Sequence, residues 1–318
     1  MRGQPKRAST APPARSVAAD LVAVLVAVTG GEPRVMTIQD GSALPSGPFA
    51  LSHRSLQSGL RSWVEEQTAH PLGYVEQLYT FADRDRSGED PDHRVISISY
   101  LGLTREEPGG GDGAGWRSWY DYFPWEDFRT GPPAMVDRVL APRLEAWAVA
   151  GSDERTVQER RQRIAITFGL AGRGWNEELV LQRYELLYEA GLVAEAQREQ
   201  PPGKAPAIPG RVMRGDHRRI LATGLARLRA KIKYRPVVFE LMPPAFTLLQ
   251  LQRTVEALAG HSLHKQNFRR LIEQQDLVEE TGAIAADTGG RPAKLFRFRH
   301  AVLAERAVAG TKLPLSRP

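Results

Sequence analysis

The sequence predicts an α+β fold with more than one domain, on three observations. At 318 residues the chain is longer than a usual single domain. Its first part alternates between strand-like and helix-like patterns in the order strand, strand, helix, strand, strand, and not as a regular βαβ repeat. Residues 211–318 hold 20 Lys+Arg and 9 Asp+Glu, a net charge of +11, and the remaining 23 Lys+Arg and 28 Asp+Glu leave −5 for residues 1–210. This asymmetry indicates a C-terminal module that binds polyanions.

The composition indicates a folded, soluble protein and excludes several kinds of site. Hydrophobic residues make up 42% of the chain and charged residues 25%, which is ordinary for globular domains. There is no cysteine, which excludes disulfides, thiolate metal sites and a cysteine nucleophile and fits a reducing compartment, so we expect the cytoplasm. The start MRGQPKRASTAPPARS followed by LVAVLVAV is superficially similar to a secretory signal. However, the apolar run follows Asp20, is short and is rich in β-branched residues, so it predicts a buried strand. It is also too short for a membrane span, which needs about 20 apolar residues.

The first 133 residues predict a mobile basic tail over residues 1–17 and an α+β domain over residues 18–133. The tail is rich in Pro, Ala, Ser and basic residues and has no periodicity. Two strands are expected at 21–28 and 34–38, joined by the hairpin turn TGGEP. Two more are expected in YVEQLYTF and RVISISYLGL, with the polar loop ADRDRSGEDPDH between them.

An amphipathic helix is expected between the two pairs of strands. Leu56, Leu60, Trp63 and Val64 have the i, i+4, i+7, i+8 spacing of one apolar stripe, and Ser55 suits the N-cap. The later glycine-rich run EEPGGGDGAG is not a phosphate-binding loop, because no Lys follows the glycines. We therefore expect a flexible loop there.

Residues 134–210 predict a helical insertion that ends in a linker. Helices are expected in AMVDRVLAPRLEAWAV, with a break at Pro142, and in SDERTVQERRQRIAITFGL, with Ser152 as N-cap. A third is expected in NEELVLQRYELLYEAGL, which Asn176 starts and Gly191 ends. The run QPPGKAPAIPG is typical of a linker. The apolar surface of these helices must be covered by the rest of the chain or by a second subunit, and our first interpretation is a homodimer interface.

Residues 211–318 predict a helix followed by a winged helix-turn-helix. The first helix runs through HRRILATGLARLRAKI and has an apolar side and a strongly basic side. Thr247 and Gln250 form a capping-box pattern for the next helix, which Gly260 ends, and Ser262 suits the N-cap of LHKQNFRRLIEQQ. The strand-like arms LVEETG and KLFRFR then flank the loop AIAADTGGRPA. Two short helices, a tight turn and two such arms are typical of a winged helix-turn-helix.

The second of these short helices carries the residue types that recognise DNA. Phe268, Leu271 and Ile272 share one face of it, which leaves the opposite face polar. Arginine pairs bidentately with guanine, glutamine with adenine, and lysine suits a phosphate. The wing loop adds basic side chains that can reach a groove or the backbone. An ordinary solvated helix face is the alternative interpretation. The expected DNA-binding residues are Lys265, Gln266, Arg269, Arg270, Arg291 and Lys294.

The C-terminal sequence resembles a known family of regulators. The runs KYRPVVFELMPPAFTLLQLQ, LHKQNFRRLIEQQDLVEETG and GGRPAKLFRF are similar to the C-terminal half of the Nudix-related regulators of NAD metabolism, the NrtR-like family and its NadQ-type branch. The resemblance covers residues 216–300. It implies a winged-helix domain joined to a degenerate Nudix-like effector domain, in a dimeric repressor of NAD-biosynthesis genes that binds double-stranded DNA at a palindromic operator. The helices of residues 134–196 look like those of the longer NadQ-type branch.

The run RSWVEEQT implies a degenerate Nudix helix. The Nudix pattern is G-x5-E-x7-R-E-U-x-E-E-x-G-U, where U is bulky and apolar, and its glutamates hold divalent cations that polarise a diphosphate and activate water. His53 replaces the first Glu, Ser62 the Glu after the Arg, and Thr68 the last Gly. The loss of two carboxylates weakens a metal site and leaves the helix intact, so we expect no catalytic residue, no metal, no required cofactor and no enzyme activity. The positions that keep the pattern are Gly47, Arg61, Trp63, Glu65 and Glu66.

We expect this domain to bind a nucleotide of NAD metabolism, namely NAD, ADP-ribose or ATP, in the former catalytic cleft. Aromatic rings can stack on a base, and arginines can bind phosphate. The alternatives are that the strand aromatics belong to the core and that the adjacent acids are merely solvated. Two other function classes stay open: a Nudix-type nucleoside-diphosphate pyrophosphohydrolase with a nucleic-acid-binding appendage, and an architectural DNA binder without an effector. The expected effector-binding residues are Arg61, Glu65, Glu66, Tyr79, Phe81 and Arg94.

Overall fold

The computed structural model describes residues 16–73, 75–83, 93–107, 113–197, 207–285, 292–299 and 301. The helices are α1 (Leu56–Thr68), α2 (Ala141–Val149), α3 (Glu154–Phe168), α4 (Val180–Glu189), α5 (His217–Ile232), α6 (Leu248–Ala259) and α7 (Lys265–Gln274). The strands are β1 (Ser16–Thr29), β2 (Glu32–Thr37), β3 (Ser46–Pro48), β4 (Val75–Phe81), β5 (His93–Leu103), β6 (Gly115–Ser118), β7 (Val278–Ala285) and β8 (Ala293–Phe298).

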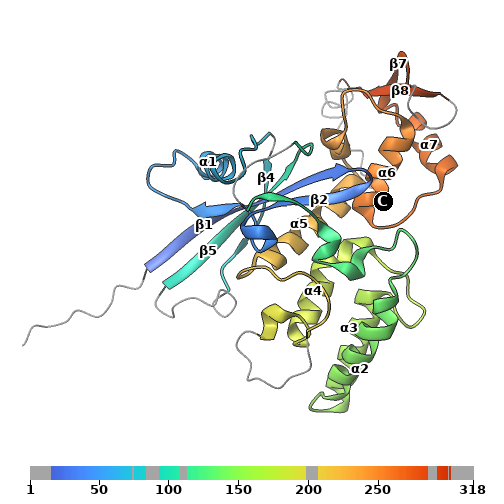
Figure 1. The fold of residues 1–318 in the computed structure, drawn as a ribbon. Helices are drawn as coiled ribbons and strands as arrows, with labels where there is room; N and C mark the ends of the chain where they lie inside the picture. The colour runs from blue at the N-terminus through green and yellow to red at the C-terminus, as the bar shows by residue number, and fades with distance from the viewer. Residues whose placement is uncertain are drawn as a thin grey trace, which may run out of the picture.

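A central β-sheet carries α1 on one face and α4 and α5 on the other (Figure 1). Helices α2 and α3 project from one end of the molecule, and α6, α7 and the β7–β8 hairpin lie at the other end. Here the part of the chain up to the end of α5 is called the body, and the part that follows is called the C-terminal unit. This α+β arrangement confirms the predicted fold class.

The sheet is mixed, with strand order β4-β5-β1-β2-β6 and with β3 paired to β1. β1 and β2 form the predicted antiparallel hairpin, whose turn residues Gly30 and Gly31 have φ of 62° and 79°, a conformation that glycine adopts readily. β1 also runs parallel to β5 from Ser16 to Val26. The expected tail therefore overlaps this sheet at residues 16 and 17, and residues 1–15 lie outside the described part.

Helix α1 forms as predicted. The Ser55 hydroxyl accepts a hydrogen bond from Ser58 N at 3.1 Å, and the Ser58 hydroxyl accepts one from Ser55 N at 2.8 Å. Leu60 and Val64 are fully buried against the sheet. The helix ends at Ala69, whose φ of 52° lies in the left-handed region. The cap and the apolar stripe thus fix both the start and the orientation of α1.

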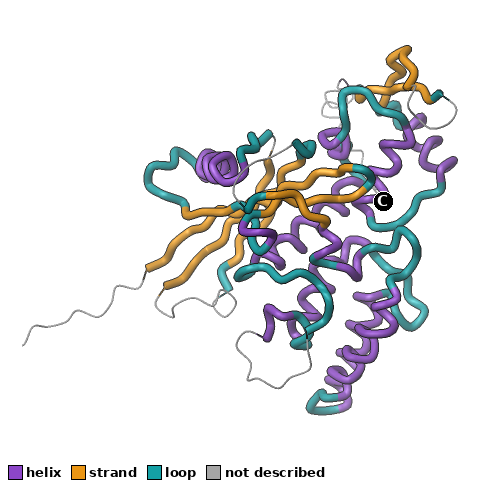
Figure 2. The backbone as a smooth tube through the Cα atoms, viewed as in Figure 1, coloured by secondary structure: helices purple, strands orange, loops and turns teal. Residues whose placement is uncertain are grey.

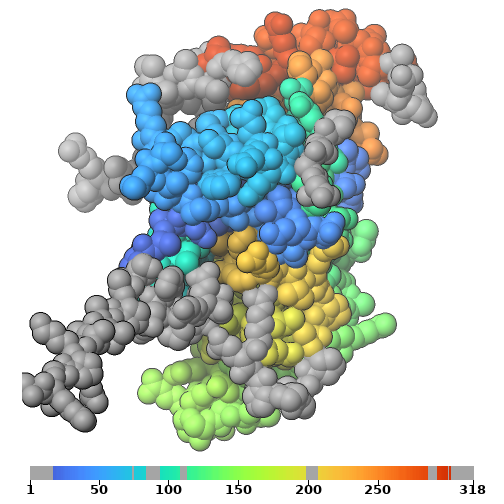
Figure 3. Space-filling view, turned by 60° about the vertical axis from the view of Figure 1, so that its left-hand side comes forward, coloured from blue at the N-terminus to red at the C-terminus, as the bar shows by residue number. Residues whose placement is uncertain are grey.

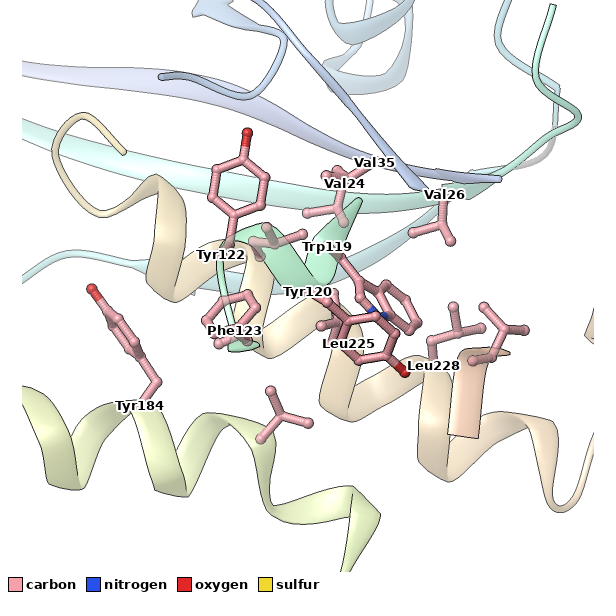
Figure 4. Close-up of a cluster of buried hydrophobic side chains, with 14 of the residues drawn as sticks. Val24, Val26, Val35, Trp119, Tyr120, Tyr122, Phe123, Tyr184, Leu225 and Leu228 are labelled. Atoms are coloured by element: carbon pink, nitrogen blue, oxygen red, sulfur yellow. The ribbon is translucent and has the colours of Figure 1, made fainter. Parts of the chain in front are cut away.

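Alternate residues of β1 point to opposite faces of the sheet. Leu21 and Leu25 pack toward α1. Val22, Val24 and Val26 join a larger core on the other face, which also contains α4, α5 and the aromatic segment 119–125 (Figure 4). Gly224 of α5 lies against Val24, where an added Cβ would come within 2.9 Å of the valine side chain. Helix α5 therefore packs closely on the sheet.

The helical insertion departs from the prediction at two helix starts. The expected break at Pro142 is wrong: the chain stays helical from the π-helical turn Val136–Leu140 into α2, and Pro142 lies in the first turn of α2. The expected N-cap Ser152 is also wrong, because Asp153 Oδ1 accepts the hydrogen bond from Thr156 N at 2.9 Å. The Ser152 hydroxyl donates to Asp153 instead. A carboxylate carries the charge that a helix N-terminus favours, so it makes the better cap.

Helices α4 and α5 cover the sheet and each other. Asn176 caps the 3-10 turn Glu177–Leu179 that leads into α4, and Gly191 follows the end of α4, as predicted. The apolar side of α4 packs on α5, so the rest of the chain covers that surface. A boundary at residue 211 would assign α5 to the C-terminal unit. Because α5 packs on the sheet, we propose to place the boundary after α5.

Helices α6 and α7 and the β7–β8 hairpin form the predicted winged helix-turn-helix. Thr247 Oγ1 accepts a hydrogen bond from Gln250 N at 3.1 Å, and Gln250 Oε1 accepts one from Thr247 N at 2.7 Å, which is the predicted capping box. Gly260, with φ of 79°, ends α6 as predicted. The predicted N-cap Ser262 is wrong, because α7 starts after His264 and has no side-chain cap.

Figure 2 shows the strands gathered in the sheet of the body and, separately, in the wing, with the helices around them. In the space-filling view the light-blue segment around α1 lies in the middle of the visible face, with the C-terminal unit above it (Figure 3). Of the helices in the described ranges, none is both long enough and apolar enough to cross a membrane. The centre of the expected glycine-rich loop, residues 108–112, and residues 200–206 of the expected linker fall outside those ranges.

Candidate functional site

The outer face of α7 carries a compact set of polar and basic side chains. Phe268 and Ile272 are each 8% exposed and form the buried face of this helix. The four residues expected to bind DNA from this helix are all exposed, and among the described residues none of the four has an ion-pair or hydrogen-bond partner for its side chain. Their polar groups are therefore available to a ligand. The four are Lys265, Gln266, Arg269 and Arg270.

Leu271 does not share the buried face, contrary to the prediction. Its side chain is 50% exposed and lines a cavity of about 800 Å³ between α7 and the end of α5. Ile232 and the exposed Tyr234 line the same cavity. Helix α7 is thus packed through Phe268 and Ile272, and the cavity separates it from the end of α5 on the side of Leu271.

Two side chains of α6 that the sequence reasoning missed fix the turn before α7. Glu256 Oε1 accepts hydrogen bonds from Leu263 N at 2.8 Å and from Gln252 Nε2 at 3.0 Å. Gln252 Nε2 also donates to Leu263 O at 3.1 Å. Both backbone groups of Leu263 are thereby satisfied, which replaces the expected cap by Ser262. The signal in the sequence was the i, i+4 spacing of Gln252 and Glu256, which places them on one face of α6.

The wing offers charges that are already compensated. Lys294 lies in β8, where its Nζ forms an exposed ion pair with Glu280 at 2.7 Å. Arg297 forms a similar ion pair with Glu279 at 2.6 Å. Arg291, the other expected DNA-binding residue of the wing, lies outside the described residues. The structure thus brings four of the six expected residues together on α7 and places Lys294 on the neighbouring hairpin.

The basic side expected for α5 is largely internal. Arg218 and Arg229 are almost fully buried. Arg218 forms an ion pair with Glu195 at 3.1 Å, and Arg229 forms one with Glu126 at 2.6 Å. These arginines neutralise buried carboxylates and present no charge to solvent. The net charge of residues 211–318 therefore overstates the charge available to a polyanion.

Three of the expected effector-binding residues lie on α1. Arg61 donates hydrogen bonds to Leu72 O and, at 2.8 Å, to Gly73 O, so its guanidinium fastens the loop that follows the helix. Glu65 and Glu66 are exposed. Within the described ranges, no group of three or more His, Asp or Glu side chains is arranged to hold a metal ion.

Side chains that hydrogen-bond to the backbone occupy the positions of the two missing glutamates. His53 Nδ1 accepts a hydrogen bond from Ala50 N at 3.1 Å, and its ring lies edge-on to that of Trp63. Ser62 donates to the backbone of its own helix at 3.1 Å. Trp63 covers Gly47, where an added Cβ would come within 2.4 Å of the indole. The residues present therefore do not fit the divalent cation that a Nudix helix holds.

The expected aromatic residues lie on the side of the sheet opposite α1. Phe81 is buried in the core beside α5, and the Arg219 guanidinium lies 4.9 Å from its ring centroid. Tyr79 is exposed, and its ring centroid lies 5.0 Å from that of Phe81. Arg94, near the start of β5, donates to Ala82 O at 2.7 Å. The six expected effector-binding residues therefore do not surround one cleft.

Comparison with known proteins agrees with this arrangement. Residues 238–298 match the family model of the NrtR DNA-binding winged helix domain. The chain is 43% identical over 83 residues to the ADPR responsive transcriptional repressor NtrR of Acinetobacter baylyi, which is 26% of this chain and 33% of that protein. The chain thus matches about a third of the length of this curated relative.

Two solved structures are similar over nearly the whole chain. The NrtR structure from Shewanella oneidensis has a TM-score of 0.52 and 19% identity, covering 88% of this chain and 94% of that one. A MutT/nudix family protein from Enterococcus faecalis has a TM-score of 0.52 and 16% identity, covering 92% and 90%. At these identities the likeness concerns the fold. The chain has a mixed α+β domain with a Nudix-like fold, followed by a C-terminal winged helix domain that matches the NrtR family model over residues 238–298.

Proposed function

We propose that the chain is a DNA-binding transcriptional repressor of NAD-biosynthesis genes that responds to ADP-ribose. The observation that carries this proposal is the outer face of α7, where four polar or basic side chains are exposed together. The matching winged helix domain and the relative from Acinetobacter baylyi, named as an ADPR responsive repressor, support it. The proposed partner is double-stranded DNA with a palindromic operator, bound by a homodimer, because paired recognition helices require a repeated half-site. The cytoplasm remains the proposed location.

The four side chains of α7 that we propose to bind DNA divide into contacts to bases and contacts to phosphates. A helix of this size fits the major groove of B-DNA. Arg270 and Gln266 face outward and can pair with guanine and adenine. Lys265, in the first turn, suits a phosphate, which positions the helix without reading sequence. Arg269 can take either role.

Fluorescence anisotropy with a duplex from upstream of NAD-synthesis genes tests the DNA proposal. Arg270→Ala is expected to weaken specific binding by about 5- to 150-fold, the effect of losing one bidentate base contact. Arg270→Lys keeps the charge but not the paired hydrogen bonds, so it should lose specificity and keep the salt dependence.

The matched control is Arg155→Ala. Arg155 is an exposed arginine of α3, at the opposite end of the molecule from α7 (Figure 1). Its removal should leave DNA affinity unchanged. If wild type and both Arg270 variants bind equally well, α7 does not read the DNA.

We infer that the Nudix-like domain binds the nucleotide effector and that its expected binding residues act as two separate sets. Glu65, Glu66 and Arg61 lie on α1, whereas Tyr79 and Phe81 lie on the opposite face of the sheet. ADP-ribose is the first candidate ligand, and NAD and ATP are the others. A ligand changes DNA affinity only as far as it binds the two states of the protein differently.

Isothermal titration with the three nucleotides tests the effector proposal and locates its face. The variant Glu65→Gln with Glu66→Gln changes only the α1 set, and Tyr79→Ala changes only the opposite set. Loss of ADP-ribose binding in one variant assigns the site to that face. No heat and no thermal shift with any nucleotide, in wild type, would contradict the effector role.

We further infer that the Nudix-like domain is not a hydrolase. The supporting observation is the local hydrogen bonding: His53 and Ser62 stand where carboxylates would hold the metal, and each is hydrogen-bonded to the backbone. The alternative, a nucleoside-diphosphate pyrophosphohydrolase with a nucleic-acid-binding appendage, requires release of AMP from ADP-ribose in the presence of Mg²⁺. Steady AMP release by the purified chain, lost in the Glu65→Gln variant, would establish that alternative.

A further inference from the structure

The C-terminal end of α6 is the point at which the DNA-reading helices meet the body. A helix leaves the carbonyl oxygens of its last turn without partners in its own backbone. In α6 these carbonyls belong to residues 257–260, directly before the turn that leads to α7. They must find hydrogen-bond donors elsewhere, since an unsatisfied buried carbonyl is unfavourable.

The body supplies donors to three of these four carbonyls, from three separate places. The Tyr120 hydroxyl donates to Ala257 O at 2.9 Å, and Arg229 Nε donates to Leu258 O at 2.9 Å. The backbone N–H of Phe128 donates to Gly260 O at 2.7 Å. We call Tyr120, Phe128 and Arg229 the α6 socket.

The fit between the α6 socket and Gly260 is close. Gly260 has φ of 79°, and an added Cβ would lie 2.5 Å from Arg229 Nη2 and 2.6 Å from Glu126 O. Glycine is therefore required here by conformation and by space. The end of α6 cannot shift on the body without breaking these contacts.

The α6 socket is itself fixed to the core of the body. Glu126 is fully buried and forms ion pairs with Arg183 of α4 and Arg229 of α5. Trp175, from the loop before α4, stacks on Phe128 with ring centroids 4.2 Å apart. A displacement of α4 or α5 relative to the sheet would therefore reach the end of α6.

We propose that the α6 socket is the route by which the Nudix-like domain sets the position of the recognition helix, with Tyr120 and Arg229 as positioning residues for DNA binding. The turn from α6 to α7 is short and is held by Gln252 and Glu256, so α7 follows the end of α6. This inference rests on the proposed function, because it concerns how effector binding changes DNA affinity.

The chain contains a matched pair of residues for the test. Tyr120 and Tyr122 are both buried, and burial raises the pKa of each phenol, so both hydroxyls stay protonated and donate. Tyr122 donates to Gly41 O at 2.7 Å, within the body, whereas Tyr120 donates to α6. The two hydroxyls point in opposite directions (Figure 4). Replacing either tyrosine by Phe removes one buried hydrogen bond and little else.

The experiment measures operator affinity by fluorescence anisotropy, with and without ADP-ribose, for wild type, Tyr120→Phe and Tyr122→Phe. The readout is the ratio of the two affinities, which a general loss of stability does not change in the folded protein. Tyr120→Phe should change this ratio by about fivefold, the effect of one hydrogen bond. Tyr122→Phe should leave the ratio as in wild type, and thermal melting should show that both variants are folded.

The possible failures are distinguishable. Equal ratios in all three proteins, with a wild type that responds to ADP-ribose, would overturn the α6 socket as the route and leave the proposed function intact. If Tyr122→Phe changes the ratio of the two affinities as much as Tyr120→Phe does, the α6 socket is also overturned as the route. A wild type that binds the operator but ignores ADP-ribose would contradict the proposed function and, with it, this coupling.

Discussion

Helices α5 and α7 are both rich in basic residues, and the structure uses them in opposite ways. On α5, Arg218 and Arg229 are buried and paired with carboxylates. On α7, Arg269 and Arg270 are exposed, and within the described part of the chain neither has an acidic partner. The amino-acid composition of the two helices does not reveal this difference.

The comparison shows which positive charges can serve DNA. A buried arginine needs a carboxylate, because a buried unpaired charge is strongly unfavourable. Once paired, it has little left to offer a phosphate. A basic segment therefore indicates a DNA-binding surface only after the arginines that neutralise internal carboxylates have been subtracted. Burial thus decides whether an arginine pairs with an internal carboxylate or is available to a phosphate.

The largest expected effect separates two arginines of the same helix. Arg229→Met leaves Glu126 without one of its two arginines inside the core, so we expect the free energy of unfolding to fall by about 3–5 kcal/mol. Arg227, two residues earlier, is exposed, and Arg227→Met should change the free energy of unfolding by less than about 0.5 kcal/mol. Urea denaturation measures both. Similar stabilities for the two variants would show that the pair with Glu126 does not hold the core.

A smaller effect, on DNA affinity, shows whether a glutamate near α7 acts by positioning the helix or only by its charge. Glu256→Gln removes one negative charge from α6, and Glu273→Gln removes one from α7, the helix that we propose to face DNA. Electrostatics alone predicts tighter DNA binding by both variants. Because the charged Oε1 of Glu256 accepts the hydrogen bond from Leu263 N, and a neutral amide oxygen accepts it more weakly, we expect Glu256→Gln to weaken binding instead, by about 1 kcal/mol, and Glu273→Gln to strengthen it slightly. Anisotropy titrations decide between the two, and tighter binding by Glu256→Gln would refute the positioning role.

Arg129 is an intermediate case, partly buried and paired with Asp127 at 2.8 Å. Burial disfavours the ionised carboxylate, but the hydrogen bonds from Arg129 outweigh this and keep the pKa of Asp127 below its ordinary value. A lowered folded-state pKa stabilises the protein above the unfolded-state pKa of about 3.9, and this stabilisation is lost as the pH falls through the folded-state pKa.

Asp127→Asn should therefore lower the free energy of unfolding at pH 7, by less than about 1 kcal/mol for a pair so near solvent. The difference from wild type should shrink as the pH falls below about 4, the unfolded-state pKa. Urea denaturation across that range checks it. A difference that stays constant with pH would mean that Asp127 acts through its shape and not through its charge.

The parts of the fold that depend on neighbouring residues could be predicted from the sequence. Ser55 and Thr247 cap their helices through hydrogen bonds three residues along the chain, and Gly260 ends α6 through its own backbone conformation. These signals need no knowledge of the tertiary structure. The same holds for the β1–β2 hairpin, whose turn is two glycines.

The parts that depend on distant residues could not be predicted in this way. The predicted N-cap Ser262 of α7 was wrong because Glu256, from the preceding helix, accepts a hydrogen bond from Leu263 N and so fixes the turn. The face of the sheet on which Phe81 lies could not be predicted, because an aromatic strand residue looks the same on either face. Only its pairing with Ser97 of β5 places it on the side of α5. The ion pair between Arg229 and Glu126 joins residues 103 positions apart, and no local pattern indicates it.

The central claim is that α7, and not α5, presents positive charge to DNA. The most direct measurement is the slope of log binding constant against log salt concentration for Lys265→Ala and Arg227→Ala, which remove one exposed charge from α7 and from α5. We predict that the slope becomes shallower by about one for Lys265→Ala and stays at the wild-type value for Arg227→Ala. An unchanged slope for Lys265→Ala together with a shallower slope for Arg227→Ala would contradict the claim.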